Sequence, residues 1–335
     1  MTAERNIHLG VLGASLALAV WVFGAERHAA GPATQSDARS QGTEPRSPLS
    51  LIPPGSAFVL SVDVPALSRA SLGAFIAERL GRTAGTSALA QSCGFDPLLR
   101  LDQVALSVPS ATLAADAQPD FGIVANGRFS GAEITRCAST VIAARGGEAI
   151  RTRLGSFDTV RDGKASSGEI AAKDGLVVVS GGSYFRELLD LAEGTRNPGS
   201  RQAARDAKHA ELRSALGPGA LLATWLLSEG WFERLAESEP NAKLSPLNGL
   251  ESIGARVNVA DTAQLRILLN AADSTRATQI ASLLGELQSS PYAALSPALM
   301  ALAKRLTVKQ SAARLALELE LNRAELSLLL DLLGP

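Results

Sequence analysis

The residues able to perform chemistry are few and widely spaced in this chain. It contains 3 histidines, of which His8 and His28 lie near the N-terminus and His209 lies in the middle of the chain. A Ser-His-Asp triad needs a histidine held beside the nucleophile and oriented by a third group, and the sequence around His209 suggests no such placement. No histidine pair has metal-ligand spacing, and the HExxH pattern is absent. We therefore expect no catalytic residues, no metal and no cofactor.

The 2 cysteines offer a structural bond rather than redox chemistry. Cys93 and Cys137 are too far apart for a CxxC motif. Cys137 falls in the apolar stripe of a predicted helix, and Cys93 lies in a loop between turn residues. Two such cysteines often pair outside the cytoplasm, where a bridge would fasten the loop to the helix. Two free thiols are the alternative, and the sequence leaves both open.

One glycine-rich turn could bind an anion. Gly181, Gly182 and Ser183 follow a predicted strand and open a predicted helix, where backbone N–H groups point outward. The plainer interpretation is a tight strand-to-helix turn in which Ser183 caps the helix. We favour the turn and keep the anion site as the weaker prediction.

The N-terminus is typical of an export signal or anchor. Residues Leu9 to Ala25 carry no charge, and their number lies at the short end of the roughly 17 to 25 that a spanning helix needs. Trp21 and Phe23 stand at the far end, where interfacial aromatics belong. We favour an uncleaved transmembrane anchor over residues 1–25, ahead of a cleaved signal peptide and of a buried core helix. Residues 26–50, rich in Pro, Ser and Gly, are predicted to be a disordered tether.

Composition excludes several classes of protein. The 335 residues carry 32 Lys plus Arg against 33 Asp plus Glu, so a strongly basic nucleic-acid binder is excluded and we expect no nucleic-acid partner. An apolar content of 46% excludes full disorder. With the N-terminal helix in the inner membrane as a single pass, the folded part would lie in the periplasm or outside the cell.

The rest of the chain shows a recurring order of elements, which predicts two similar repeats at residues 51–198 and 199–335. Each has a strand, a helix, two further strands, a capped helix, a hairpin and a closing helix that ends at glycine. The predicted strand pairs are 55–63 and 219–227, 101–108 and 250–257, 121–125 and 264–269, then the hairpins 169–180 and 306–320. The first helices follow Pro65 and begin at Glu229, the capped ones begin at Ser130 and near Asp273, and the closing ones end at Gly194 and Gly334.

The predicted fold class is therefore α+β. Each repeat is expected to be ferredoxin-like (β-α-β-β-α-β), with a mainly antiparallel sheet and helices on one face, after one N-terminal transmembrane helix. Residues 200–216 form a polar helix pattern that contains His209. We interpret this pattern as a solvated connector; the alternative is a basic surface that faces anionic lipid head groups.

Two phrases of the sequence support a family resemblance. The segment Leu51–Asp63, with two prolines, a small residue, an apolar strand and Asp, resembles the start of the folded part of membrane-anchored bacterial envelope proteins. A second motif consists of Cys93–Leu98 followed by Leu101–Val104. It is similar to a sequence motif in such proteins of myxobacterial type. The resemblance implies an extracytoplasmic location, a duplicated α+β domain of unknown function and no established activity, and it supplies no catalytic residues.

The function that these observations favour is binding or scaffolding by a membrane-anchored extracytoplasmic protein without catalytic activity. Its expected partners are the membrane, through the N-terminal helix, and an envelope protein or an apolar ligand. The alternative is an apolar-ligand or lipid-binding module of the envelope. A hydrolase built from carboxylates or a serine is the third hypothesis, and it is the least favoured because histidine is so scarce.

Overall fold

The computed structural model describes residues 47–76, 86–109, 120–164, 168–195, 200–228, 247–289 and 297–333. The predicted anchor, most of the predicted tether and the predicted helix at Glu229 lie outside these ranges. Among the described helices, none has both the length and the apolar content that crossing a membrane requires. The end of the predicted tether belongs to the fold, because η1 (Pro48–Leu51) buries Pro48 and Leu51 against the sheet.

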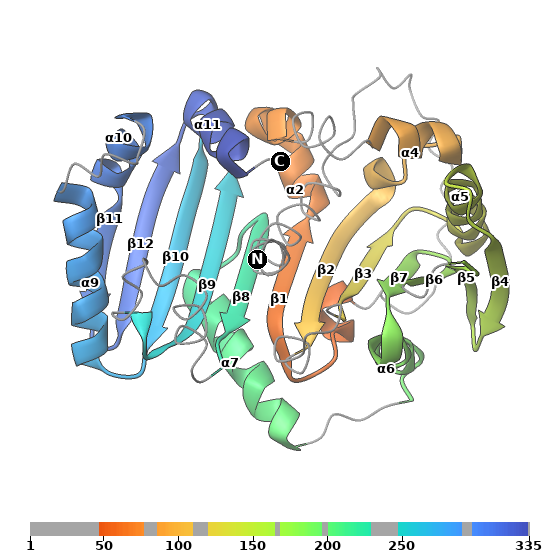
Figure 1. Ribbon diagram of the computed structural model, residues 1–335, viewed down its shortest axis with the longest axis horizontal. Coiled ribbons are helices and arrows are strands. Elements are labelled where there is room, and N and C mark those ends of the chain that lie inside the picture. Colours follow the sequence, from red (N-terminus) through yellow and green to blue (C-terminus); the bar gives the residue numbers. More distant parts are fainter. Residues whose placement is uncertain are drawn as a thin grey trace.

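One antiparallel sheet of 12 strands forms the centre of the molecule, in the order β11-β12-β10-β9-β8-β1-β2-β3-β7-β6-β5-β4 (Figure 1). The prediction of an α+β fold with a mainly antiparallel sheet is confirmed. The strands are β1 (Ser56–Asp63), β2 (Leu101–Pro109), β3 (Gly122–Gly127), β4 (Ala149–Leu154), β5 (Phe157–Asp162), β6 (Glu169–Lys173), β7 (Leu176–Ser180), β8 (Leu221–Leu226), β9 (Leu250–Val259), β10 (Ala263–Ala271), β11 (Thr307–Ser311) and β12 (Arg314–Leu321).

The two halves of this sheet repeat one strand order. The first runs β1-β2-β3-β7-β6 and the second runs β8-β9-β10-β12-β11, and the β4–β5 hairpin extends the first half only. The halves meet where β1 pairs with β8, with Leu60 opposite Ala223. A ferredoxin-like repeat requires parallel strands joined by helical crossovers, whereas every strand pair here is antiparallel. The ferredoxin-like expectation is therefore wrong, because β2 pairs directly beside β1 instead of leaving a gap for a later strand.

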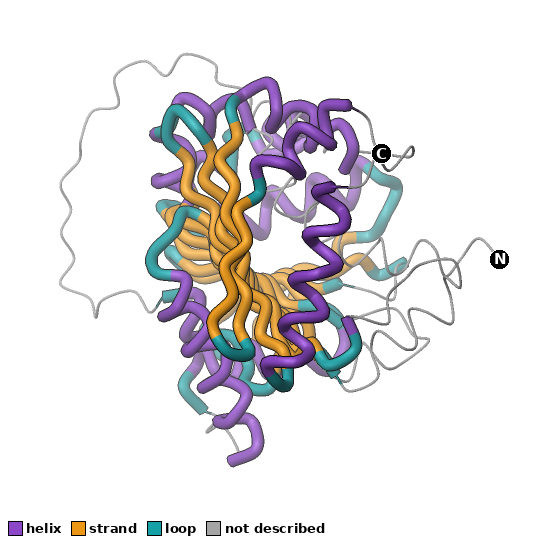
Figure 2. Tube along the Cα trace, turned by 90° about the vertical axis from the view of Figure 1, so that its left-hand side faces the viewer, coloured by secondary structure: helices purple, strands orange, loops and turns teal. Residues whose placement is uncertain are grey.

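The described helices cover both faces of the sheet, not one as predicted (Figure 2). Ile123 and Ala125 of β3 pack in one apolar cluster, while Val124 between them packs in another that contains residues of α6. We call the first side the α5 face and the second the α7 face, after the helices that lie there. The helices are α2 (Val64–Arg69), α4 (Thr86–Cys93), α5 (Gly131–Ala144), α6 (Gly182–Glu193), α7 (Ser200–Leu216), α9 (Ser274–Ser289), α10 (Pro297–Arg305) and α11 (Arg323–Leu333), with a short η2 (Leu98–Arg100).

Side-chain caps place several of these helices where the sequence predicts them. Asp63 accepts from the N–H of Ala66 at 2.8 Å and so starts α2 directly after β1. Ser130 and Glu133 form the predicted capping box of α5. The pKa of Glu133 falls to about 2 because the Ser130 N–H, and next the Arg100 guanidinium, donate to its carboxylate.

Candidate functional site

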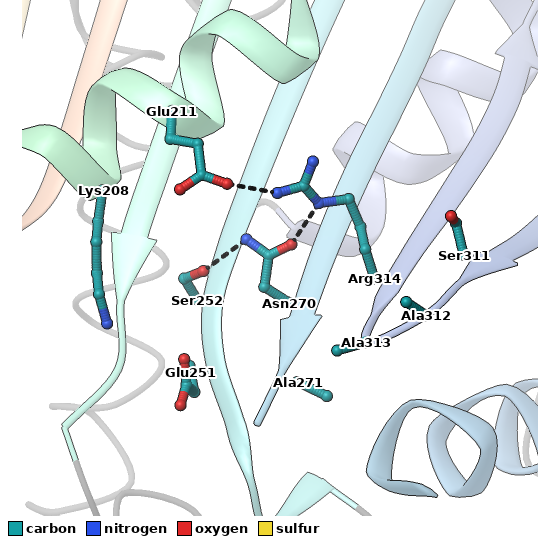
Figure 3. A pocket seen from close by; sticks show the side chains of 10 residues that line it. All are labelled: Lys208, Glu211, Glu251, Ser252, Asn270, Ala271, Ser311, Ala312, Ala313 and Arg314. Atoms are coloured by element: carbon teal, nitrogen blue, oxygen red, sulfur yellow. Dashed lines mark hydrogen bonds and ion pairs between the residues drawn. The ribbon is translucent and has the colours of Figure 1, made fainter. Parts of the chain in front are cut away.

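A polar hollow of about 400 Å³ opens on the α7 face of the second half (Figure 3). Its walls come from α7, from the start of β9, from the end of β10 and from the turn between β11 and β12. It is lined by Lys208, Glu211, Glu251, Ser252, Asn270, Ala271, Ser311, Ala312, Ala313 and Arg314. Four of these side chains are charged, three belong to alanines, and no aromatic ring is among them.

A chain of hydrogen bonds fixes one wall of this hollow (Figure 3). The Arg314 guanidinium donates from Nη2 to Glu211 Oε1 at 2.8 Å and from Nε to Asn270 Oδ1 at 2.7 Å. Asn270 Nδ2 in turn donates to Ser252 Oγ at 3.0 Å. The sheet register brings these residues together, because Asn270 stands opposite Ser252 on one side and Arg314 on the other. The strand register thus positions Ser252, Asn270 and Arg314, and α7 supplies Glu211.

Two further charges line the hollow without joining that chain. Lys208 and Glu251 are both exposed, and among the described residues no ion pair joins one to the other. Lys208 extends from α7 toward the side of the hollow where Glu251 lies (Figure 3). Their charges are therefore offered to solvent or to a ligand, on the side away from Arg314.

The helix α7 sets the positions of Lys208 and Glu211. Its inner side buries His209, Leu212 and Leu216, so that residues 208 and 211 point outward beside the hollow. The predicted solvated connector is wrong in this respect, because α7 covers the sheet where the two halves meet. Burial also raises the pKa of Asp206 and lowers the pKa of Arg213 on the same helix.

His209 is only 2% exposed and ties α7 to both halves. Its Nε2 lies 3.0 Å from the carbonyl oxygen of Ser56 in β1, and its Nδ1 lies 2.7 Å from Thr224 Oγ1 in β8. A carbonyl oxygen can only accept, so Nε2 carries a proton. The sequence alone placed His209 on a polar surface; the structure makes it a buried fastening between the halves.

A second buried polar group lies beside it. The Tyr184 hydroxyl of α6 lies 2.9 Å from Ser56 Oγ and donates to Ser107 Oγ at 2.9 Å. Burial raises the pKa of Tyr184, although both hydrogen bonds oppose that shift. These groups have hydrogen-bond partners inside the protein, so we assign them to the structure and not to a site.

The sequence leaves a disulfide and two free thiols open, and the structure contains the disulfide. Cys93 at the end of α4 and Cys137 in α5 are joined, with their Cα atoms 4.4 Å apart. The bridge lies at the far end of the sheet from the hollow (Figure 1). It fastens α4 to α5, and the prediction of a loop at Cys93 is wrong because Cys93 is the last residue of α4.

The predicted anion turn takes the form of a tight connection. Gly181 is the N-cap of α6 and Gly182 has φ +62°, which favours glycine. A Cβ on Gly182 would lie 2.7 Å from an Asp120 carboxylate oxygen, so a negative charge already stands at this turn. The side chain of Ser183 lies outside the description, and the anion site stays a prediction.

Within the described ranges, no cluster of three or more His, Cys, Asp or Glu side chains could hold a metal ion. The wall of the hollow cannot be recognised in the sequence alone. Asn270 and Arg314 are separated by 44 positions, and only the strand register makes them neighbours. A polar residue on the inward-alternating side of a strand was the available signal, since Asn270 follows Leu268 on the same face.

Comparison with known proteins identifies a similar fold but no family. No family model matches the chain, and no curated protein matches it either. The chain is similar to TP0453 in crystal form III, with a TM-score of 0.51 and 11% identity over 84% of this chain and 96% of that chain. Crystal form I of TP0453 gives a TM-score of 0.49 and 12% identity over 86% and 98% of the two chains. At this identity the likeness to crystal form III shows a shared fold alone.

Proposed function

We propose that this chain is a membrane-anchored binding protein of the extracytoplasmic space, and that it acts by binding rather than by catalysis. The observation that carries the proposal is the charged hollow. Its wall is held by the hydrogen-bonded chain from Glu211 through Arg314 and Asn270 to Ser252. A preorganised polar wall beside the exposed charges of Lys208 and Glu251 is what a small-molecule site needs for orientation and specificity.

The location rests on the disulfide and on the N-terminal sequence. Disulfides persist in oxidising compartments and are rare in the cytosol, which favours export of the folded part. The anchor over residues 1–25 and the tether that follows belong to this proposal. The test is protease treatment of cells that express the full chain. We expect digestion in spheroplasts and protection in intact cells; protection in both would contradict the location.

The described hollow gives little support to the alternative of an apolar ligand. Burying Lys208, Glu211, Glu251 and Arg314 under an apolar molecule would remove water from four charges and return no hydrogen bonds. The acyl chains of a lipid would therefore have to bind elsewhere on the protein. Envelope protein partners remain compatible with the proposal, since a chain end can enter a hollow of this size.

Native mass spectrometry of the full chain, purified in detergent from the membrane, tests the binding function. We expect a small polar adduct that disappears on mild activation. The matched comparison is Arg314→Leu, which removes the centre of the hydrogen-bonded wall, with Arg323→Leu on α11 as a control outside the hollow. An adduct retained by Arg314→Leu, or an apo mass under every condition, would contradict this site as the binding site.

A further inference from the structure

The charges of the hollow define the class of ligand more narrowly than binding alone, and this inference rests on the proposed function. Two cations, Lys208 and Arg314, and two anions, Glu211 and Glu251, line one cavity. A ligand with net negative charge would face both carboxylates, and one with net positive charge would face both cations. Each of these ligands would lose on one side what it gains on the other.

The arrangement of the charges also favours a ligand that carries both a positive and a negative charge over an uncharged ligand. Glu211 and Arg314 satisfy each other at 2.8 Å, so this pair forms part of the wall. Lys208 and Glu251 are the charges of opposite sign for which the described residues supply no ion pair. A neutral sugar would leave both charges without a counterion, and the hollow lacks the aromatic ring on which a sugar could stack.

Polar groups on the floor and wall of the hollow can complete the recognition. Ser252 Oγ accepts from Asn270, which leaves its own hydroxyl proton to donate. Arg314 uses Nε and Nη2 for Asn270 and Glu211, which leaves its Nη1 group to donate. Figure 3 shows the remaining Arg314 nitrogen pointing away from Lys208 and Glu251, so the Ser252 hydroxyl is the donor nearer to Lys208. Glu251 lies on the same side of the hollow as the end of Lys208 (Figure 3), and its carboxylate can accept from an ammonium group.

We infer that the hollow binds a small zwitterion that carries an ammonium group and a carboxylate, as a free amino acid or a short peptide does. The ammonium group pairs with Glu251, and the carboxylate pairs with Lys208 and accepts from the Ser252 hydroxyl. A volume of about 400 Å³ is at the lower end of the roughly 300–1,000 Å³ of small-molecule sites, which fits a ligand of this size. Ala271, Ala312 and Ala313 leave room for a small apolar side chain.

Isothermal titration calorimetry on the full chain in detergent tests this inference with four compounds. Alanine and alanyl-alanine carry both charges, N-acetyl-alanine lacks the positive charge, and alanine amide lacks the negative charge. We expect one or both of the zwitterions to bind and the two blocked compounds to bind at least tenfold more weakly. Binding of alanine alone would indicate a free amino acid, and tighter binding of alanyl-alanine would indicate a peptide; either result supports the zwitterion.

Two variants assign each charge to its partner. Glu251→Gln is expected to weaken binding of the zwitterion about tenfold. It should also abolish the preference for alanine over N-acetyl-alanine. Lys208→Gln is expected to weaken binding of the zwitterion to a similar extent. It should also abolish the preference for alanine over alanine amide. Both residues are exposed, so both variants should fold. Glu286→Gln and Lys304→Gln make the same chemical changes on exposed positions of α9 and α10, away from the hollow, and should change nothing.

The inference is overturned if the blocked compounds bind as well as alanine, or if neither zwitterion gives heat at millimolar concentration. Failure of the zwitterion inference can be distinguished from failure of the proposed function. A native-mass adduct of another chemistry, lost in Arg314→Leu, would keep the hollow as a binding site and reject only the zwitterion. An apo mass together with no heat from any compound would reject both.

Discussion

The two halves of the sheet share a strand order but use their closing helices on opposite faces. In the first half, α6 packs Tyr184, Phe185 and Leu188 onto the α7 face. In the second half, α11 packs Leu326 and Leu329 with the cluster of Leu302 and Leu321 on the α5 face. The α7 face of the second half therefore lacks a closing helix, and α7 contacts β8, β9 and β10 there instead. The hollow lies in the region that this difference leaves open.

The same register carries different residues at the corresponding place in each half. In the second half, Asn270 stands between Ser252 and Arg314; in the first half, Asn126 stands between Gln103 and Leu176. Leu176 packs against the apolar cluster that contains Leu51 and Phe185, whereas Arg314 holds Glu211 across the hollow. One scaffold thus supports an apolar core in one half and a charged cavity in the other, depending on which helix covers it.

The largest expected effect comes from the disulfide, which only the first half contains. The double variant Cys93→Ala/Cys137→Ala should lower the free energy of unfolding by about 4 kcal/mol, because the bridge closes a loop across 44 positions. Chemical denaturation measures the loss. Hydrogen exchange should show faster exchange in α5 and unchanged exchange in α9, its counterpart in the second half. Equal acceleration in both helices would show that the halves do not unfold separately.

Truncating a leucine in the closing helix should lower the free energy of unfolding more in the first half than in the second. Leu188 of α6 is 0% exposed, so Leu188→Ala leaves a cavity and should cost about 3 kcal/mol. Leu329 of α11 is only half-buried, and Leu329→Ala should cost about 1 kcal/mol. Denaturation midpoints of the two variants give the comparison directly. Equal losses would mean that α11 holds its half as firmly as α6 does.

Periodicity predicted many of the individual elements, but not the helices α4 and α10. The alternation of apolar residues over 55–63 and 264–269 corresponds to β1 and β10 within a residue or two, and Ser130 starts α5 as its capping pattern predicts. The β4–β5 hairpin was missed because charged residues occupy much of it, with Arg151, Arg153 and Asp158 exposed. A strand at the end of a sheet has little apolar surface to reveal it.

The pairing of strands that are distant in the chain could not be predicted from the sequence. Apolar residues in β1 and β8 predict two strands but do not tell which edges meet, and their pairing makes one sheet from two halves. The site depends on the same information, since Glu211, Asn270 and Arg314 are brought together by α7 and the register of β10 and β12. His209 was misplaced for this reason as well, because its partners lie in both halves.

The junction between the halves offers the next comparison. His209→Leu would leave the Ser56 carbonyl and the Thr224 hydroxyl without their partner, so we expect a loss of about 2 kcal/mol in the free energy of unfolding. Lys208→Gln, next to it but exposed, should change stability by less than about 0.5 kcal/mol. A double-mutant cycle with Thr224→Val should give a coupling of about 1 kcal/mol. No coupling would mean that the hydrogen bond to Thr224 does not stabilise the junction.

The smallest expected effect is a pH dependence of stability. It should arise at the start of α5 in the first half and not at the start of α9 in the second. Glu133 at the start of α5 has a pKa lowered from 4.5 to about 2, chiefly by the hydrogen bond from the Ser130 N–H and then by Arg100. The counterpart α9 begins with Asp273, which accepts from the Arg276 N–H at 2.8 Å. Because the folded pKa of Glu133 lies below the unfolded one, its ionised form stabilises the fold above pH 4.5, and this contribution disappears as the pH falls toward 2.

Glu133→Gln should therefore lower the thermal midpoint at pH 7, and the difference from the wild type should shrink steadily between pH 4.5 and pH 2. The Glu133 side chain is 36% exposed and solvent screens its ion pair, so the effect at pH 7 should be at most about 1 kcal/mol. Scanning calorimetry across this range measures it, with Glu286→Gln on α9 as the pH control. A difference that stays constant down to pH 2 would show that the substitution acts through lost hydrogen-bond geometry and not through lost charge.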